Sequence, residues 1–562
     1  FLRVEYFLEF NDIINVSVIS SFIYLILFFI FNIYKQYFRY FSFNSGQLYL
    51  RIYIFFGLLF GFYVLYQSQN FIPRSLILIF PTFFFLLIII NRFLVSNLFE
   101  FFTQSKKKAV VFGFNPTNIN ALLSYAKITC FVDDKNINTK RIINGIKILS
   151  TKEFNSNFDS YGFNLILIEN EKIFNKSKYY IRKHLFENKI LVQKISSKKN
   201  ELITSSYFDF NYFFNRKNKI SSLGDTYKNK IVLITGAGGS IGSNIVFQLI
   251  KSKYKKIFLL DKSEYNLYEI SNKISNKKNI FFLLKNFNHR KDMEQIIIKN
   301  KIDIIFHAAA YKHVPLIELN PFSAIKNNFL DTFELMKLSS QLKVSNFCLI
   351  SSDKAVRPTN IMGATKRLSE LALTYLNNLN ENKTKFCSVR FGNVINSSGS
   401  VKPLFQYQID NNLPITLTHK KIIRYFMTIE EAANLVLNTI KISVGGEVFL
   451  LDMGKSIKLY DLAKLMIQFS GKTLKQNGIG DIDIKVIGLR KGEKLFEELL
   501  VDQKSKETNI NSIYQSLETN IKKKEFIEIL SKIQNYYNNN DISKLKIALK
   551  HKFINYLPLN EK

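Results

Sequence analysis

Residues 231–242 read IVLITGAGGSIG, and this stretch indicates the fold of the chain. Its first five residues form a continuous apolar run, which is typical of a buried parallel strand. Gly236, Gly239 and Gly242 follow with the spacing that allows a tight turn, close approach of the backbone to a pyrophosphate and close packing of the next helix. The apolar segment 245–250 predicts that helix, so a pyrophosphate would lie at its N-terminus. The stretch therefore predicts a Rossmann unit that binds a dinucleotide.

The residues around this turn indicate which dinucleotide binds. A second predicted strand, 257–260, ends in Asp261, about 20 residues after the turn, where an acidic side chain accepts hydrogen bonds from the adenosine ribose. This favours NAD, although Lys262 directly after it leaves NADP open. Ser240 and Ile241 lie within the turn and are expected to contact the same cofactor.

A further predicted strand, 303–307, leads into a run of small residues. Ala308 and Ala309 leave room there for the nicotinamide half of the cofactor. His307 is expected to be a packed histidine at the strand end. Lys312 follows in the loop that would face the active site and is a candidate for substrate binding.

The catalytic motif is expected in residues 351–366, SSDKAVRPTNIMGATK. It has the spacing of a short-chain dehydrogenase site, a Ser or Thr followed by Tyr-x-x-x-Lys on a helix, but Met362 occupies the tyrosine position. A thioether cannot accept a proton from an alcohol, so the site either is inactive or uses other groups. The adjacent Asp353 and Lys354 favour the second interpretation. The alternative interpretation of Asp353 and Lys354 is a surface ion pair on a loop.

Three apolar stretches in the first hundred residues, near 13–34, 48–66 and 72–90, predict membrane helices, since a span needs about 20 residues. Buried core helices of a soluble domain are the alternative, but the aromatic-rich ends and the succession of three runs favour membrane spans. The chain begins with Phe1 and not with Met, so we expect that residues upstream, and with them a further span, could be missing.

The distribution of basic residues predicts the orientation in the membrane. The first connecting loop contains Lys35, Arg39 and Arg51, whereas the second contains only Arg74. Residues 106–108, after the third span, are all lysine. By the positive-inside rule the first loop and everything after the third span are cytoplasmic.

The sequence predicts an α/β protein with four regions. They are a transmembrane region (1–104), a degenerate Rossmann-like domain (105–220), an extended short-chain dehydrogenase Rossmann domain with a smaller C-terminal substrate subdomain (221–505), and a helical C-terminal tail (506–562). The second region keeps only Gly113 of the glycine pattern, which favours a structural or regulatory domain. Helical patterns at 526–537 and 542–553 could cap the substrate subdomain or form an oligomer contact.

The composition limits the choice of partners. The net charge of +34 could attract anionic lipid headgroups or phosphorylated substrates. Biased codon usage, which enriches lysine on solvated surfaces, explains the larger share of this charge. There is no cluster of basic and aromatic residues, which argues against nucleic acid. Cys130, Cys348 and Cys387 are far apart in the sequence and are expected to be buried in a reducing compartment, with no metal site.

Six motifs occur in the order of a known family: residues 235–242, 307–315, 352–366, 390–394, 424–428 and 492–494. They resemble the membrane-anchored nucleoside-diphosphate-sugar 4,6-dehydratases of bacterial polysaccharide biosynthesis, the CapD-type family of the extended short-chain dehydrogenase/reductase superfamily. The resemblance covers nearly the whole chain. The long branch of that family also has Met at the tyrosine position, so Met362 strengthens the match.

The resemblance implies conversion of UDP-N-acetylglucosamine, or a close UDP-N-acetylhexosamine, to the UDP-4-keto-6-deoxy sugar. Oxidation at C4, elimination of water across C5 and C6, and return of the hydride to C6 regenerate a tightly bound NAD, with NADP as the alternative. The product would feed surface polysaccharide or glycan biosynthesis. The family also implies a multi-pass protein of the bacterial inner membrane with cytoplasmic catalytic domains, and we expect a homo-oligomer.

The resemblance also implies roles for the catalytic residues. Asp353 would be the acid toward the C6 oxygen and Lys354 the base at C5, with the pKa of Lys354 pulled down by burial and by Lys366. Lys366 would hold the nicotinamide ribose, and Ser352 would offer its hydroxyl to the C4 oxygen. With Met362 present, the group that takes the C4 hydroxyl proton stays open, and Asp353 is the first candidate.

Substrate binding is carried over in the same way. Asn393 would contact the phosphates or the sugar of the UDP-sugar, while Arg424 and Arg490 suit bidentate diphosphate binding. A structural salt bridge is the alternative for each arginine. Two other functions are considered: a nucleotide-sugar 4-epimerase, which ordinarily needs the missing tyrosine, and a non-catalytic dinucleotide-binding scaffold in a glycan assembly complex, which has no need of Asp353, Lys354 and Lys366.

Overall fold

The computed structural model describes residues 10–31, 43–66, 75–102, 107–135, 141–177, 180–181, 190–198, 201–205, 220–498, 505–518 and 521–559 of the chain. The chain forms two compact units. One contains residues 1–107 with 125–127, and the other contains residues 108–124 with 128–562.

The first unit consists of three apolar helices, α1 (Phe10–Ile30), α2 (Phe43–Tyr66) and α3 (Leu76–Phe102). Within α2, Tyr49–Tyr66 is long and apolar enough to cross a membrane by length and composition, whereas the apolar stretches Ile14–Ile30 and Leu76–Asn91 are shorter. Large apolar side chains on all three helices are exposed, which suits helices that contact lipid.

Part of the membrane prediction falls on residues that are not described. Residues 32–34 of the first predicted span and 72–74 of the third lie outside the described residues. The same holds for Lys35, Arg39 and Arg74, on which the orientation depends. The three helices are therefore confirmed, while their insertion and orientation stay predictions.

The second unit begins with a seven-stranded sheet in the order β3-β4-β2-β1-β5-β6-β7. Its strands are β1 (Lys108–Phe112), β2 (Lys127–Val132), β3 (Ile142–Ile143), β4 (Ile146–Leu149), β5 (Leu165–Ile168), β6 (Leu191–Lys198) and β7 (Glu201–Ser205). The pairs β2–β4, β1–β5 and β5–β6 are parallel, and helices α4 (Ile119–Tyr125), α5 (Thr151–Ser156) and α6 (Glu171–Lys176) connect strands of the sheet. This confirms the predicted Rossmann-like topology, and a regulatory or structural role stays a prediction.

The largest sheet has nine strands in the order β10-β9-β8-β11-β12-β13-β18-β22-β21. They are β8 (Ile231–Thr235), β9 (Lys256–Asp261), β10 (Ile280–Leu284), β11 (Ile304–His307), β12 (Asn346–Ile350), β13 (Lys385–Arg390), β18 (Glu447–Leu451), β21 (Ser505–Glu507) and β22 (Ile513–Ser516). Strands β8 to β13 and β18 run parallel. The chain order reverses between β8 and β11, and ligands of such sheets bind at this switch point, beyond the carboxyl ends of the strands.

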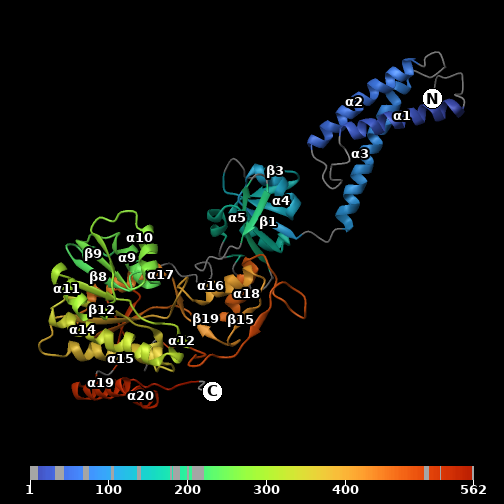
Figure 1. The fold of residues 1–562 in the computed structure, drawn as a ribbon. Coiled ribbons are helices and arrows are strands. Elements are labelled where there is room, and N and C mark those ends of the chain that lie inside the picture. The colour runs from blue at the N-terminus through green and yellow to red at the C-terminus, as the bar shows by residue number, and fades with distance from the viewer. Residues whose placement is uncertain are drawn as a thin grey trace. The chain divides into compact units, whose positions relative to one another are not determined.

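Helices cover both faces of this sheet (Figure 1). On one side lie α9 (Ser240–Leu249), α10 (Glu264–Lys273) and α17 (Ile429–Ile442), and on the other lie α11 (Arg290–Asn300), α14 (Asp331–Gln341) and α15 (Ile361–Asn377). The predicted dehydrogenase domain is thus confirmed as a doubly wound sheet.

The C-terminal region is built into this domain. Strand β22 pairs antiparallel with β18, and β21 pairs with β22. Helices α19 (Lys523–Asn538) and α20 (Ile542–Leu549) follow, and Phe526 of α19 stacks on Tyr375 of α15 with ring centroids 4.6 Å apart. The prediction of a helical tail from residue 506 is therefore wrong for its first part. The short strands carried no clear sequence signal, because β22 pairs with β18, which is distant in the sequence, and β21 pairs with β22.

A smaller subdomain is built from two segments, one between β13 and β18 and one after β18. It contains α16 (Val401–Asp410), α18 (Leu459–Phe469) and the strand pairs β14 (Asn393–Val394) with β17 (Phe426–Met427), β15 (Ile415–Leu417) with β20 (Ile484–Val486), and β16 (Ile423–Arg424) with β19 (Ile457–Lys458). Phe405, Ile409 and Met466 belong to its separate core. Because β13 ends at the carboxyl edge of the sheet, the first segment starts at the edge where the ligand is expected.

A buried ion network joins the C-terminal region to the sheet. Arg390 of β13 is fully buried, and its Nε and Nη2 donate to the two carboxylate oxygens of Glu370 at 2.8 and 2.6 Å. Its Nη2 also donates to Glu518 at 3.0 Å. Burial raises the pKa of Glu518, but the hydrogen bond and charge of Arg390 outweigh it and lower that pKa to about 2.

We expect Arg390→Met to destabilise this domain by about 3–5 kcal/mol, because it removes the two shortest charged hydrogen bonds of the buried Glu370 and leaves Arg367, at 3.3 Å, as its cation. Urea unfolding of the full chain, followed by circular dichroism, measures the loss. Arg290→Met is the matched control: Arg290 is half exposed, pairs with Glu334 at 3.5 Å, and should cost less than about 1 kcal/mol. Equal losses in the two variants would contradict the network. Because the pKa of Glu518 is lowered on folding, its stabilisation is present above its usual value of 4.5 and is lost as the pH falls toward 2.

Candidate active site

The glycine turn lies between β8 and α9, at the switch point. Gly236 has a φ of +64°, and a Cβ there would lie 2.7 Å from the backbone of Ala309. A Cβ on Gly242 would collide with the carbonyl oxygen of Gly236. Gly239 is the N-cap of α9 and provides no side-chain cap, so the first N–H groups of the helix stay available to an anion. The turn therefore fits a dinucleotide pyrophosphate.

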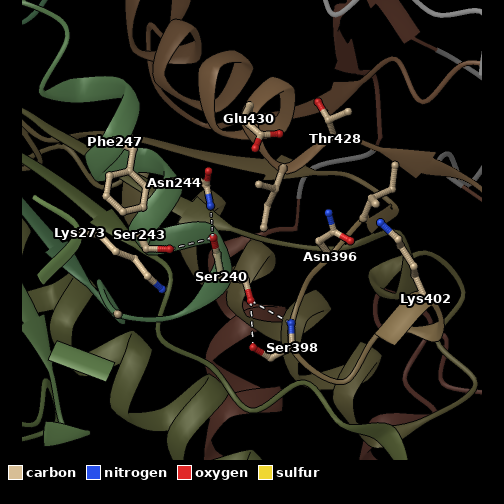
Figure 2. Close-up of a pocket in the computed structure, with 13 residues that line it drawn as sticks. Ser240, Ser243, Asn244, Phe247, Lys273, Asn396, Ser398, Lys402, Thr428 and Glu430 are labelled. Atoms are coloured by element: carbon tan, nitrogen blue, oxygen red, sulfur yellow. Dashed lines mark hydrogen bonds between the residues drawn. The ribbon is translucent and has the colours of Figure 1, made fainter. Parts of the chain in front are cut away.

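A cavity of about 600 Å³ opens beside this turn (Figure 2). Ser240 points toward the loop after β14, where the N–H of Ser398 donates to its Oγ at 3.1 Å. Lys273 and Lys402 also line the cavity. Their positive charge beside a helix N-terminus suits a phosphate-bearing ligand.

Asp261 ends β9 beside the glycine turn, as predicted. Its side chain accepts hydrogen bonds from the N–H groups of Gly238 and Ser263, both at 3.0 Å. The neighbouring Lys262 is directed elsewhere, because its Nζ donates to the hydroxyl of Tyr311 at 2.7 Å. The structure thus places a buried carboxylate where the ribose of a dinucleotide would lie.

The end of β11 forms the other wall of the cofactor site. Ala308 donates its N–H to the carbonyl of Thr235 at 3.1 Å, which places the small residues 308–310 against the glycine turn. His307 is buried, with Nδ1 hydrogen bonded to Thr235 Oγ1 at 2.7 Å and Nε2 to Thr332 Oγ1 at 2.9 Å. Burial lowers its pKa to about 3. The prediction of a packed strand-end histidine is confirmed.

The predicted catalytic pair lies in a short 3-10 turn, η5 (Asp353–Ala355), directly after β12. Asp353 is 1% exposed, and its Oδ1 accepts from Ser352 Oγ at 2.8 Å and from Lys354 Nζ at 2.9 Å. Lys354 also donates to Asn393 Oδ1 at 3.4 Å. The alternative of a surface ion pair is therefore wrong, since Asp353 is buried and Lys354 is only 20% exposed and hydrogen bonded to Asp353 and Asn393.

Helix α15 brings the rest of the motif to this turn. Asn360 caps the helix, accepting from the N–H of Gly363 at 2.9 Å. Met362 is 4% exposed, and Lys366, one turn later, is 7% exposed. Lys366 Nζ donates to the carbonyl of Ile350 at 2.8 Å. Burial lowers the pKa of Lys366 to about 8, and the charge of Glu370 opposes part of this shift.

The structure reverses the expected direction of the pKa shift at Lys354. Burial alone would lower this pKa, but the carboxylates of Asp353 and Glu497 outweigh it, so the pKa lies above its usual value. The prediction failed because it left out the charge of Asp353, the larger of the two carboxylate influences, and that of Glu497, which reaches Lys354 from a distant part of the sequence.

The two candidate diphosphate arginines differ in their surroundings. Arg424 is 6% exposed, and its Nη1 and Nη2 donate to the carbonyls of Ile423, Leu495 and Lys494 at 2.8, 3.2 and 2.9 Å. The structural alternative therefore explains Arg424 better than diphosphate binding does. Arg490 is exposed on the loop after β20 and keeps its proposed role.

The remaining substrate candidates occupy different positions. Asn393 lies at the catalytic pair through its contact with Lys354. Lys312 is exposed on the loop between β11 and α12 (Val314–Leu319). Glu497 was not predicted from the sequence. The family motif at residues 492–494 lies close to Glu497 in the sequence, but no residue spacing predicted a role for Glu497 itself.

A doubly wound parallel sheet, a glycine turn at its switch point and a Met-x-x-x-Lys helix beside a buried Asp-Lys turn define an extended short-chain dehydrogenase/reductase. Residues 232–518 match the family model described as "Polysaccharide biosynthesis protein", and the chain belongs to this family.

Several known proteins are similar to this part of the chain. The capsular polysaccharide biosynthesis protein CapD of Staphylococcus aureus is 47% identical over 276 residues, 48% of this chain and 45% of CapD. A UDP-N-acetylglucosamine 4,6-dehydratase (inverting) of Campylobacter jejuni is 31% identical, covering 53% of this chain and 85% of that enzyme. A UDP-glucose 4-epimerase of Rickettsia canadensis is 32% identical, with coverages of 49% and 78%. The matched region thus spans less than half the length of CapD.

Proposed function

We propose that the protein is a UDP-N-acetylglucosamine 4,6-dehydratase that feeds polysaccharide biosynthesis. The observation that carries the proposal is the hydrogen bond of 2.9 Å between Lys354 and the buried Asp353, next to Met362. An epimerase needs redox chemistry at C4 alone. Elimination of water across C5 and C6 additionally needs a proton acceptor and a proton donor side by side, which this pair supplies.

The residues of the cluster divide the proton transfers between them. Asp353 accepts the proton of the C4 hydroxyl and passes it to the departing C6 oxygen. Lys354, once it has lost its own proton, takes the proton from C5 and, after its ammonium has exchanged with solvent, returns a proton there. Ser352, hydrogen bonded to Asp353, orients the carboxylate and the sugar hydroxyl. Because Met362 stands where a tyrosine phenol usually lies, Asp353 takes the place of that phenol as the proton acceptor for the C4 hydroxyl.

The cofactor in this proposal is NAD, which supplies hydride transfer when bound. Gly236, Gly239, Ser240, Ile241 and Gly242 would hold its pyrophosphate. Asp261 would hold the adenosine ribose, and a buried carboxylate there disfavours the extra phosphate of NADP. Ala308 and Ala309 would face the nicotinamide, and Lys366 its ribose. Asn393, Lys312 and Arg490 would bind the UDP-sugar.

The location in the proposal is the bacterial inner membrane, with α1, α2 and α3 as a multi-pass anchor and the second unit in the cytoplasm. The apolar stretch Tyr49–Tyr66 and the exposed apolar side chains of the three helices support this. The subunits are proposed to form a homo-oligomer.

The second candidate is a 4-epimerase, supported by the similarity to the Rickettsia enzyme. Incubation of the full chain with UDP-N-acetylglucosamine, without added cofactor, distinguishes the two by mass spectrometry. A product lighter by one water supports the dehydratase. An isomer of unchanged mass supports the epimerase. Absence of any product, with NAD and NADP supplied and other UDP-hexoses tried, contradicts both and supports the scaffold.

A further inference from the structure

A second carboxylate lies beside the catalytic lysine. Glu497 Oε1 is 3.8 Å from Lys354 Nζ and 3.9 Å from Arg424 Nη2, and the Glu497 side chain is only 4% exposed. Its other oxygen, Oε2, is buried and has no hydrogen-bond partner among the residues that the structure describes. A buried carboxylate with an unpaired oxygen is costly, so its presence at this point calls for a function.

Three hydrogen bonds from side chains to backbone carbonyls position the segment that carries Glu497. Lys494 Nζ donates to the carbonyl of Val356 at 2.9 Å, within the loop that joins η5 to α15. Thr359 Oγ1 and Asn360 Nδ2 donate to the carbonyl of Gly492 at 2.9 and 3.0 Å. These hydrogen bonds hold the segment that carries Glu497 against the catalytic loop.

The charged groups around Lys354 come from three segments. Asp353 faces it from the same turn, Glu497 from the segment after Gly492, and Arg424 from β16. The charge of Lys494 in turn acts to lower the pKa of Glu497. Arg424 opposes the two carboxylates, but its guanidinium already donates to three carbonyl oxygens. The two carboxylates together outweigh its charge and favour the ammonium form of Lys354.

We propose that Glu497 is a positioning residue that holds the proton on Lys354 and so sets the pH above which Lys354 can act as the base at C5. This inference rests on the proposed dehydratase function. Lys354 must lose its proton before it can accept another one, so turnover should rise with pH as Lys354 deprotonates. Removing the charge of Glu497 releases that proton more easily and moves the rise to lower pH.

Two variants of the full chain test the proposal through the pH profile of kcat on UDP-N-acetylglucosamine. Glu497→Gln keeps the shape of the side chain and removes its charge, so the midpoint of the rise should move down by about 1 pH unit or more. Glu497→Asp keeps the charge and should hold the midpoint close to that of the wild type. Glu498→Gln is the matched control, because Glu498 is 42% exposed and pairs with Arg357 and Lys494 instead. A lower kcat with an unchanged midpoint in Glu497→Gln would show a purely structural role and overturn the proposal.

A second measurement separates this proposal from the proposed function. The full chain without substrate is labelled with acetic anhydride over a range of pH, and mass spectrometry follows acetylation of Lys354. The pH of half-maximal labelling should fall in Glu497→Gln and stay unchanged in Glu498→Gln. If the wild type produces no product, the dehydratase assignment fails, while the labelling still decides the role of Glu497. An equal labelling midpoint in wild type and Glu497→Gln overturns it.

Discussion

Lys354→Ala should lower turnover by about a thousand-fold, in the range that positioned acid–base groups contribute, while the protein keeps its bound cofactor. The amine is hydrogen bonded to Asp353 at 2.9 Å and to Asn393 at 3.4 Å, and in the proposed function it is the base at C5. The glycine turn does not depend on it, because Gly236 and Gly242 pack on Ala309 and on the turn itself.

Kinetics, exchange of the C5 proton with deuterated water and extraction of the bound cofactor measure the effect together. Arg357→Gln is the control: Arg357 lies on the same loop, and its half-exposed side chain pairs with Glu498 at 3.4 Å. It should leave kcat unchanged. Normal turnover in Lys354→Ala would remove Lys354 from the role of base, and loss of the cofactor would show that the variant acts on binding.

Gly363→Ala should lower turnover by about a hundred-fold although alanine is the better helix former. Gly363 lies in the first turn of α15, and a Cβ there would collide with the carbonyl oxygen of Lys354 and lie 3.1 Å from Pro358. Lys354 lies in η5 and Pro358 in the loop between η5 and the helix, so the Asp353–Lys354 turn or the helix must move. A shift of about 1 Å in such a geometry can cost about a hundred-fold in rate.

Helix propensity alone predicts the opposite result, a gain of about 1 kcal/mol for Gly→Ala in a helix interior. Ala364→Gly, at the next position, is the control: it should cost about 1 kcal/mol by propensity and keep activity. Steady-state kinetics and urea unfolding of both variants decide the matter. An active and more stable Gly363→Ala would show that the close approach of α15 to Lys354 is not needed.

Local patterns in the sequence sufficed for most of the fold. The apolar run 231–235, the glycine spacing after it and Asp261 are neighbours along the chain, and each appears in the structure where it was expected. The Asp353–Lys354 pair could be predicted for the same reason. Its two members are adjacent in the sequence, and Met362 at the tyrosine position indicated that other acid–base groups are needed.

The features that were missed depend on contacts between distant segments. Glu497 lies near Lys354, and Arg424 near Glu497, although all three are distant from one another in the sequence. Asp353 is adjacent to Lys354, but no spacing along the chain reveals Glu497 as a second carboxylate, and the direction of the pKa shift of Lys354 was predicted wrongly. Strands β21 and β22 were missed because they pair with β18 and with each other rather than forming a pattern of their own.

The central claim is that the Asp353–Lys354 pair performs an elimination. NMR of the full chain with UDP-N-acetylglucosamine in deuterated water, without added cofactor, tests it most directly. The account predicts a 4-keto or hydrated-ketone product with a new C6 methyl group and solvent deuterium at C5. A C4 epimer with an intact C6 hydroxyl and no deuterium at C5 would contradict it.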